Sequence, residues 1–222
     1  FQERLGSLYD KTVRLCMLTK YLAPIVGSDV SLSIRTAELC KSDLVTDMVG
    51  EFEGLQGVMG RYYAINDGED SEVAEAILEH YMPKFSGDAI PGTTTGATLA
   101  IADRLDTLVG IFGIGQPPSG SKDPFALRRS SLGLLRIIVE HKIDLDLYEA
   151  LEIAASQHSN LQVSDTVVSK QVLTYVLDRF KHWYEDEKIP VEIFSSVAAR
   201  KLNSPLDIHQ RVKAVYAFSA FP

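Results

Sequence analysis

Two aspartates of this 222-residue sequence, Asp43 and Asp103, lie in contexts where a carboxylate could hold a divalent metal. A hydrolytic metal centre of this kind combines an upstream histidine, an adjacent His-Asp pair and a distant aspartate, because imidazole and carboxylate together hold the metals that activate water. Ser42 stands where the paired histidine would be, and no histidine precedes His80. The sequence therefore predicts vestigial positions at Ser42, Asp43 and Asp103 and no metal ligand set.

Two carboxylates without imidazole could still hold magnesium weakly through water. A metal-dependent phosphohydrolase of the HD type with altered ligands therefore stays an alternative. In the simpler interpretation, Asp43 and Asp103 cap helices or pair with bases such as Lys41 and Arg104. We favour this interpretation, which gives the chain no catalytic residue, no cofactor and no metal of its own.

The segment from Gly115 to Lys122 resembles a phosphate-binding loop in composition only. Ser121 occupies the position of the required lysine, and the segment follows a helical pattern, whereas such a loop joins a strand to a helix. Glu51, Gln56 and Arg61, with Tyr62, could line a polar pocket near Asp43. An internal polar network is the simpler interpretation of these four residues.

Four cations, Lys122, Arg128, Arg129 and Arg136, fall within fifteen residues of an otherwise acidic chain. On a helix that begins near residue 124, Arg129 and Arg136 share a face. Clustered arginines at the start of a helix can bind RNA phosphates. They can equally pair with nearby acids or dock onto a neighbouring domain. These four residues are our candidates for RNA contact, and a purely structural interaction domain is the alternative.

The net charge of −8 and the sequence pI of about 5.1 argue against a free-standing nucleic-acid-binding protein.

Cys16 and Cys40 lie on apolar stretches without metal spacing and are expected to be reduced. No apolar run approaches the ~18 residues of a membrane span, so we expect a cytoplasmic protein without membrane contact. The chain opens FQERLG without methionine and closes AFSAFP, which favours a piece of a longer polypeptide.

Helical periodicity dominates the sequence, and the alternating pattern of strands is missing, which predicts an all-α fold. Glycines, prolines and caps predict helices with these approximate spans: 5–22, 34–48, 55–65, 73–81, 99–109 and 124–141, then three or four more punctuated at Asn160, Pro190 and Pro205. Residues 110–121 are predicted to form a loop.

Four aromatic residues in the last third of the chain are expected in the core: Tyr175, Phe180, Trp183 and Tyr184. A composition shift near 141–146 predicts domains at 1–142 and 143–222.

Two long segments resemble the central region of the bacterial glycyl-tRNA synthetase beta subunit. They are KSDLVTDMVGEFEGLQGVMGRYYA (41–64) and LAIADRLDTLVGIFGIGQPPSGSKDPFALRRSSLGLLRI (99–137), and the later SPLDIHQRVKAVYAF resembles the helical body that follows. The resemblance is strongest over residues 1–140. It implies an HD-domain-like helical bundle with a degenerate metal site over 1–142, followed by a smaller helical domain, with an anticodon-binding part beyond residue 222.

This resemblance also implies partners and a role. In that family an alpha subunit activates the amino acid with ATP and magnesium, and the beta subunit binds and positions tRNA. We therefore expect the chain to be a non-catalytic part of an ATP-dependent glycine-tRNA ligase. Its expected partners are the alpha subunit, tRNA(Gly) and the rest of the beta subunit.

Overall fold

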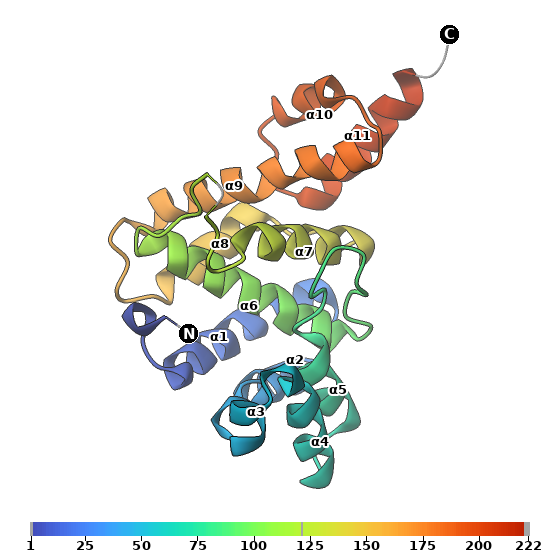
Figure 1. The fold of residues 1–222 in the computed structure, drawn as a ribbon. Helices are drawn as coiled ribbons and strands as arrows, with labels where there is room; N and C mark the ends of the chain where they lie inside the picture. The colour runs from blue at the N-terminus through green and yellow to red at the C-terminus, as the bar shows by residue number, and fades with distance from the viewer. Residues whose placement is uncertain (1, 121, 220–222) are drawn as a thin grey trace.

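The computed structural model describes residues 2–120 and 122–219, and over these residues the chain is all-α (Figure 1). The longer helices are α1 (Leu8–Val26), α2 (Val30–Leu39), α4 (Val58–Asn66), α5 (Ser71–Glu79), α6 (Thr94–Gly113), α7 (Leu127–Glu140), α8 (Leu147–Ser156), α9 (Asp165–Asp186), α10 (Val191–Ala198) and α11 (Pro205–Ser219). Short turns complete the set: η1 (Glu3–Leu5), η2 (Ser42–Val45), α3 (Asp47–Glu51) and η3 (Glu53–Leu55). The described part contains no strand beyond one isolated bridge between Ser119 and Lys122.

Helix α6 is the centre of the fold. Nearly all of its residues from Thr95 to Gly113 are buried, and α1, α2, α5, α7, α8 and α9 all pack against it. A helix that is largely apolar on every side, as α6 is apart from Asp103, Arg104 and Asp106, has to be enclosed in this way. Gly110 and Gly113 lie inside α6 because a β-carbon at these positions would come within 2.7 Å of Leu5 and 2.4 Å of Leu161.

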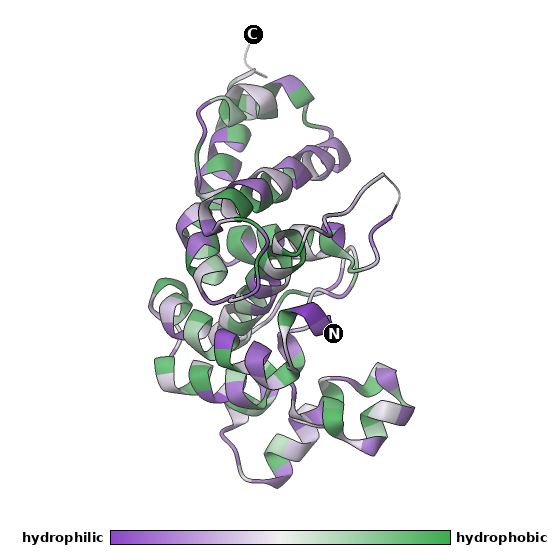
Figure 2. Ribbon diagram, turned by 90° about the vertical axis from the view of Figure 1, so that its left-hand side faces the viewer, coloured by the Kyte–Doolittle hydropathy of each residue, from purple (hydrophilic) through white to green (hydrophobic). Residues whose placement is uncertain are grey.

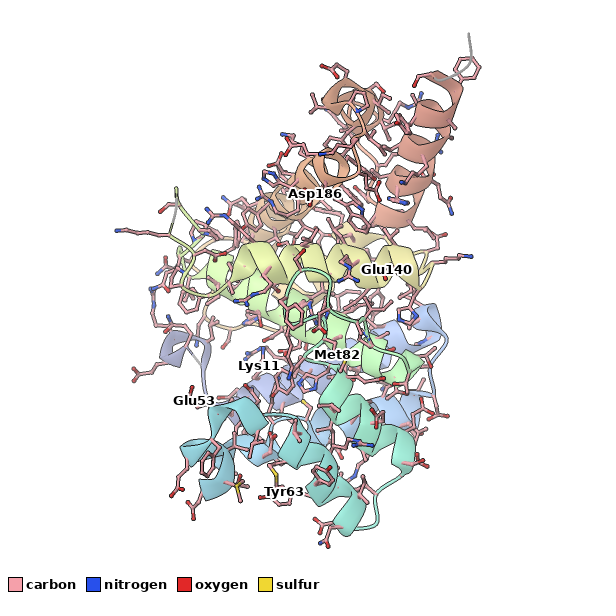
Figure 3. All side chains as sticks on the ribbon, turned by 45° about the vertical axis from the view of Figure 1, so that its right-hand side comes forward. Lys11, Glu53, Tyr63, Met82, Glu140 and Asp186 are labelled. Atoms are coloured by element: carbon pink, nitrogen blue, oxygen red, sulfur yellow. The ribbon has the colours of Figure 1, made fainter. Side chains whose placement is uncertain are left out.

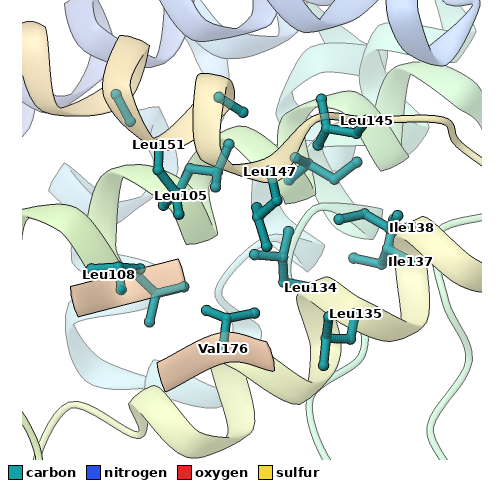
Figure 4. Close-up of a cluster of buried hydrophobic side chains, with 14 of the residues drawn as sticks. Leu105, Leu108, Leu134, Leu135, Ile137, Ile138, Leu145, Leu147, Leu151 and Val176 are labelled. Carbon is teal, nitrogen blue, oxygen red and sulfur yellow. The ribbon is translucent and has the colours of Figure 1, made fainter. Parts of the chain in front are cut away.

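One apolar cluster joins α6, α7, α8 and α9 (Figure 4). The labelled members are Leu105, Leu108, Leu134, Leu135, Ile137, Ile138, Leu145, Leu147, Leu151 and Val176. This packing crosses the residues 142–143 at which the sequence predicts a domain boundary, and that boundary stays a prediction. The helices carry hydrophobic and hydrophilic residues on different faces (Figure 2), as packed amphipathic helices do.

A smaller unit, α2–α5, lies below α6 in Figure 1 and has a second small core of Ala64, Val73, Ala74 and Ile77. The helix expected over 34–48 is wrong here. The structure ends α2 at Leu39, continues with η2 over Ser42–Val45 and begins α3 at Asp47, where the side chain of Thr46 caps the new helix. A capping residue inside an apolar run, here the extended Thr46, starts a separate helix.

The loop expected over 110–121 begins late, since α6 continues to Gly113. The next helix also begins later than predicted, at Leu127 and not at residue 124. Asp123 does cap it, but from a preceding turn: its Oδ1 accepts from the amide of Leu127 at 2.8 Å and its Oδ2 from that of Arg128 at 2.9 Å. The loop between α6 and α7 projects from the helices at the right of Figure 2.

Three or four helices are expected after residue 142, and the structure has four in the described residues, α8 to α11, with two buried aromatic residues at their centre. Phe180 and Tyr184 of α9 stack with ring centroids 5.4 Å apart and are almost wholly buried, while Tyr175 and Trp183 are partly buried. Their prediction as core residues is confirmed. Among the described residues, none of the helices has the length and apolar content needed to cross a bilayer.

Gly57 precedes α4 with a positive φ of 79°, and a β-carbon there would lie 2.7 Å from Cδ2 of Tyr81. We predict that Gly57→Ala lowers the free energy of unfolding by about 1–3 kcal/mol, because it adds both backbone strain and a clash. Chemical denaturation measures the change. The matched control is Gly54→Ala, where a β-carbon meets nothing within 4 Å and the cost should stay within about 0.5 kcal/mol. Equal stability of the two variants would contradict this assignment.

Candidate functional site

A cleft runs along α6 where α1, the end of α5 and the α6–α7 loop converge. Its larger cavity measures about 670 Å³, and a second of about 280 Å³ adjoins it. The two cavities share Gln56, Tyr81, Asp103, Thr107 and Phe125. Figure 3 shows Lys11, Glu53 and Met82 around this part of the molecule. A cavity of this size falls in the range of small-molecule sites.

Asp103 forms the floor of the cleft, and both of its oxygens are occupied by lysine. The Nζ of Lys11 lies 2.7 Å from Oδ1, and the Nζ of Lys41 lies 2.9 Å from Oδ2. Burial by itself would raise the pKa of Asp103, but the charges of Lys11 and Lys41 outweigh burial and hold that pKa well below its usual range. Two ammonium groups thus supply the positive charge that a metal ion would otherwise provide.

Asp106, one turn further along α6, extends the same network. Three nitrogen atoms lie close to its carboxylate oxygens: Nζ of Lys11 at 2.9 Å, Nε of Arg14 at 2.5 Å and Nε2 of His158 at 3.2 Å. Burial opposes ionisation of Asp106, yet these neighbours lower its pKa. Lys11 and Arg14 on α1 therefore face Asp103 and Asp106 on α6, both pairs being three residues apart on one helical face.

His80 contributes a neutral imidazole to this network. Its Nδ1 lies 2.7 Å from the carbonyl oxygen of Ile77, which requires a proton on Nδ1, so Nε2 is free to accept from Nζ of Lys41 at 2.8 Å. Burial lowers the pKa of His80 well below its usual value, and the charge of Lys41 lowers it further. The Lys41 ammonium also lies 4.3 Å from the ring centroid of Tyr81.

The structure separates the two aspartates that the sequence analysis paired. Asp43 lines neither cavity; its Oδ2 accepts from the amides of Gly57 at 2.7 Å and Gly60 at 3.2 Å. Ser42 is exposed, and the residue beside it, Lys41, faces Asp103. Asp43 therefore holds the start of α4, as the capping interpretation expects.

Arg104 has a structural role in the cleft wall. Its guanidinium donates to the carbonyl oxygens of His80, Met82 and Pro83 and to that of Ala100. Burial lowers the pKa of Arg104 to about 10. It does not pair with Asp103, contrary to one option considered from the sequence, because its side chain points to the backbone that follows α5.

The four candidate cations differ in their surroundings. Arg129 lines the larger cavity and donates to the carbonyl of Lys84 at 3.3 Å. Arg136 pairs with Glu140 at 2.8 Å and donates to the carbonyl of Asp88 at 2.9 Å. Arg128 donates to the carbonyl of Gly120. Lys122 is exposed.

Of the polar residues expected near Asp43, only Gln56 reaches the cleft, where its Nε2 donates to the hydroxyl of Tyr81 at 2.8 Å. Arg61 pairs with Glu75 at 2.6 Å. Glu51 and Tyr62 are exposed and line neither cavity. The structure therefore does not bring the four residues together.

A metal does not fit this cleft as it stands. Among residues 2–120 and 122–219, no group of three or more His, Cys, Asp and Glu side chains is arranged to hold a metal ion. Binding one at Asp103 would place a divalent cation beside two ammonium groups, and Coulomb repulsion in a buried site opposes this. We therefore derive no metal-dependent step.

The sequence alone does not predict the part that four residues take in this site: Lys11, Arg14, Asp106 and His158. The positions of Lys11, Arg14 and Asp106 on their helices could have indicated this. Lys11 and Arg14 precede Leu15 and Leu18 by four residues, so they lie on the apolar face of α1, and the two aspartates lie on the all-buried α6. Charged residues on buried faces of two helices, with opposite signs and equal spacing, indicate a buried ion-pair network.

We predict that His80 makes the protein less stable in mild acid. An unfolded histidine takes up a proton near pH 6.5, whereas folded His80, with its lowered pKa, stays neutral. Unfolding then binds a proton, so the free energy of unfolding falls as the pH drops from 6.5 to 5, by up to about 1.4 kcal/mol per pH unit for this one group. His80→Gln should show a shallower decline in denaturation experiments across this range.

The control is His182→Gln, because His182 is exposed and faces only Glu185. This variant should keep the pH dependence of the parent. Equal slopes for the parent and His80→Gln would show that folding does not lower the pKa of His80, and would contradict this prediction.

Comparison with known proteins assigns the family. The family described as glycyl-tRNA synthetase beta subunit matches residues 1–199. Curated relatives named glycine–tRNA ligase beta subunit include those of Chromohalobacter salexigens, 52% identical over 99% of this chain, and of Marinobacter nauticus and Pseudomonas fluorescens, each 52% identical over all of it. The chain spans about a third of these relatives, 32% of each. On this evidence, the chain belongs to the glycyl-tRNA synthetase beta subunit family.

Proposed function

We propose that this chain is a non-catalytic part of a glycine–tRNA ligase, in which it supports tRNA binding and the architecture of the beta subunit. The alpha subunit of the ligase binds ATP and magnesium and performs the chemistry. The partners of the chain are that alpha subunit, tRNA(Gly) and the rest of the beta subunit, in the cytoplasm. The observation that carries the proposal is a cleft whose floor is a lysine–aspartate network and whose rim carries Lys84 and Arg129.

The non-catalytic role rests on Asp103. A metal-activated hydrolase needs an ionised carboxylate free to bind the ion. Both oxygens of Asp103 already contact ammonium groups, and Asp43 lies outside the cleft with its Oδ2 bonded to the amides of Gly57 and Gly60. His80, the imidazole nearest to Asp103, accepts from Lys41.

The RNA role rests on the distribution of charge. Residues 29–80 hold twelve of the 30 acidic and three of the 22 basic side chains, a net charge of −9, and the rest of the chain has a net charge of +1. The residues outside 29–80 include the four cations of the segment from Lys122 to Arg136. RNA phosphates bind where positive charge is concentrated, so the α7 side of the molecule suits tRNA better than the α2–α5 side.

A purely structural role for this segment is the second candidate, and specific contacts favour it for two residues. Arg129 and Arg136 donate to backbone carbonyls of Lys84 and Asp88, which fastens the loop after α5 to α7. Removing them would disturb that loop whether or not RNA binds there. Lys122 and Arg128 give the cleaner test, because the one backbone contact between them, from Arg128 to the carbonyl of Gly120, stays within the α6–α7 segment and does not fasten the loop after α5.

We predict that Lys122→Glu combined with Arg128→Glu weakens binding of tRNA(Gly) by the full-length two-subunit ligase. Loss of two phosphate contacts should reduce the slope of log K against log salt by roughly 0.9 for each contact. Filter binding or fluorescence anisotropy over a salt series measures this slope. The two subunits should still associate.

Lys170→Glu on α9 is the matched control, since Lys170 is exposed and lies outside the 122–136 segment. An unchanged affinity and salt slope for the double variant would favour the structural role over the RNA role. Formation of glycyl-adenylate without the alpha subunit would contradict the non-catalytic role.

A further inference from the structure

Arg104 is a buried cation that pairs with no carboxylate of the described residues. Its side chain is only 9% exposed. Its guanidinium donates to the backbone carbonyl oxygens of four residues, of which Met82 is labelled in Figure 3: His80, Ala100, Met82 and Pro83. Its Nε is buried and has no hydrogen-bond partner in the described part of the chain. Carbonyl oxygens are neutral, so they solvate the charge of Arg104 without balancing it.

Arg14, the other buried arginine among the described residues, shows what Arg104 lacks. The Nε of Arg14 lies 2.5 Å from Oδ1 of Asp106, so its charge is balanced within the fold. Asp103, which precedes Arg104 on α6, is already held by two lysines. A buried charge costs free energy unless an opposite charge faces it. Because Arg104 lines the cavity of about 670 Å³, an anion bound there would balance its charge.

Two further cations of this cavity, Lys84 and Arg129, are exposed and form no ion pair among the described residues. They are held next to each other, because the guanidinium of Arg129 donates to the carbonyl oxygen of Lys84 at 3.3 Å. Arg136, on the same helix as Arg129, lies outside the cavity and pairs with Glu140 at 2.8 Å. The cavity therefore brings together three cations that no carboxylate of the described residues balances.

Positive charge dominates the lining of the whole cleft. Three carboxylates line the two cavities: Glu53, Asp103 and Asp106. Six cations line them: Lys11, Arg14, Lys41, Lys84, Arg104 and Arg129. Six cations against three carboxylates give the cleft a net charge of +3, in a chain whose net charge is −8. A concave surface with one sign of charge concentrates ligands of the opposite sign.

Aromatic rings and neutral polar groups complete the lining. Tyr81 and Phe125 line both cavities, as do the side chains of Gln56 and Thr107. Aromatic rings stack on nucleobases, and amide and hydroxyl groups exchange hydrogen bonds with their edges. A concave site of about 670 Å³ suits a compact ligand and not the surface of a folded partner.

We propose that this cleft binds a phosphomonoester dianion attached to a nucleoside, with Lys84 and Arg129 as donors to the phosphate and Arg104 as a further positive charge in the wall. A phosphomonoester carries a charge of about −1.5 to −2 at neutral pH, whereas a phosphodiester within an RNA chain carries a single negative charge. Three unbalanced cations match the monoester better. Arginine also presents paired donors to phosphate oxygens.

Two kinds of molecule carry this group: a free nucleoside monophosphate and the 5′ end of an RNA. The RNA source rests on the proposed function, because it requires tRNA beside this chain. The free nucleotide requires no RNA. Both would place the same phosphate between Lys84 and Arg129, so the chemistry of the site is common to them.

Calorimetric titration of the full-length beta subunit, with EDTA present, tests the site with AMP, GMP, CMP and UMP and with the nucleoside of each. At least one monophosphate should bind saturably, and its nucleoside should bind more weakly by about tenfold or more, because it lacks the charged hydrogen bonds. Lys84→Gln with Arg129→Gln should weaken binding of the nucleotide by a similar factor. The matched control is Arg136→Gln, since Arg136 also donates to the loop after α5 but lines neither cavity, and it should leave binding unchanged.

A second measurement separates the two sources. The two-subunit ligase is titrated with tRNA(Gly) that carries either a 5′-phosphate or a 5′-hydroxyl. Weaker binding of the hydroxyl form, with the difference lost in the Lys84/Arg129 variant, supports the site with the RNA end as its ligand. Equal affinity for the two forms, together with saturable binding of a monophosphate, supports the site with a free nucleotide as its ligand.

Two results would overturn the proposal. One is nucleotide binding that the Lys84/Arg129 variant leaves unchanged or that the nucleoside matches. The other is no saturable binding of any monophosphate together with equal affinity for the two tRNA forms. In that case a lower unfolding temperature of the Lys84/Arg129 variant would show that a carboxylate elsewhere in the beta subunit occupies the cleft.

The comparisons of nucleotide with nucleoside and of the two tRNA forms need no variant, so they decide the matter even if the double variant does not fold. All of these proteins keep Lys122 and Arg128. The outcome is therefore distinguishable from that of the salt-dependence test of the proposed function.

Discussion

The structure depends on neutralising a carboxylate inside an apolar bundle. Asp103 lies on α6, the most enclosed helix, and an unpaired charge there would cost several kcal/mol. Lys11 from α1 and Lys41 from the end of α2 meet it within 3 Å. Each lysine also ties its own helix to α6, so the requirement for charge balance fixes how the amino-terminal helices sit on the central one.

The same requirement shapes the cleft. Lys41 contacts His80 at the end of α5, and Arg104, the neighbour of Asp103 on α6, bonds to the carbonyls that follow His80. These bonds fix the start of the segment between α5 and α6 in place. Two cavities adjoin there, and Asp103 lines both of them. The polar groups at the floor of this cleft bond to one another, which stabilises the pocket without a bound ligand.

The sequence predicts most of the helices because their apolar periodicity is strong, and α6 is the clearest example. It does not predict that residues 34–48 divide among α2, η2 and α3, because the apolar pattern continues through the cap at Thr46. The two aspartates are predicted as vestigial, and the suggestion that Lys41 pairs with an aspartate agrees with the structure. The contribution of Lys11 is not predicted, since it lies 92 residues from Asp103 and only the packing of α1 on α6 brings them together.

Lys41 and Asp103 stabilise the fold as a pair. A double-mutant cycle of Lys41→Met and Asp103→Asn, with free energies of unfolding from chemical denaturation, measures their coupling directly. We expect each single variant to lose about 3–5 kcal/mol, because each leaves a buried group without its partner. The double variant should lose less than the sum by at least about 1.5 kcal/mol. Losses that add to within about 0.5 kcal/mol would show that the two residues stabilise the protein independently, and would contradict the account.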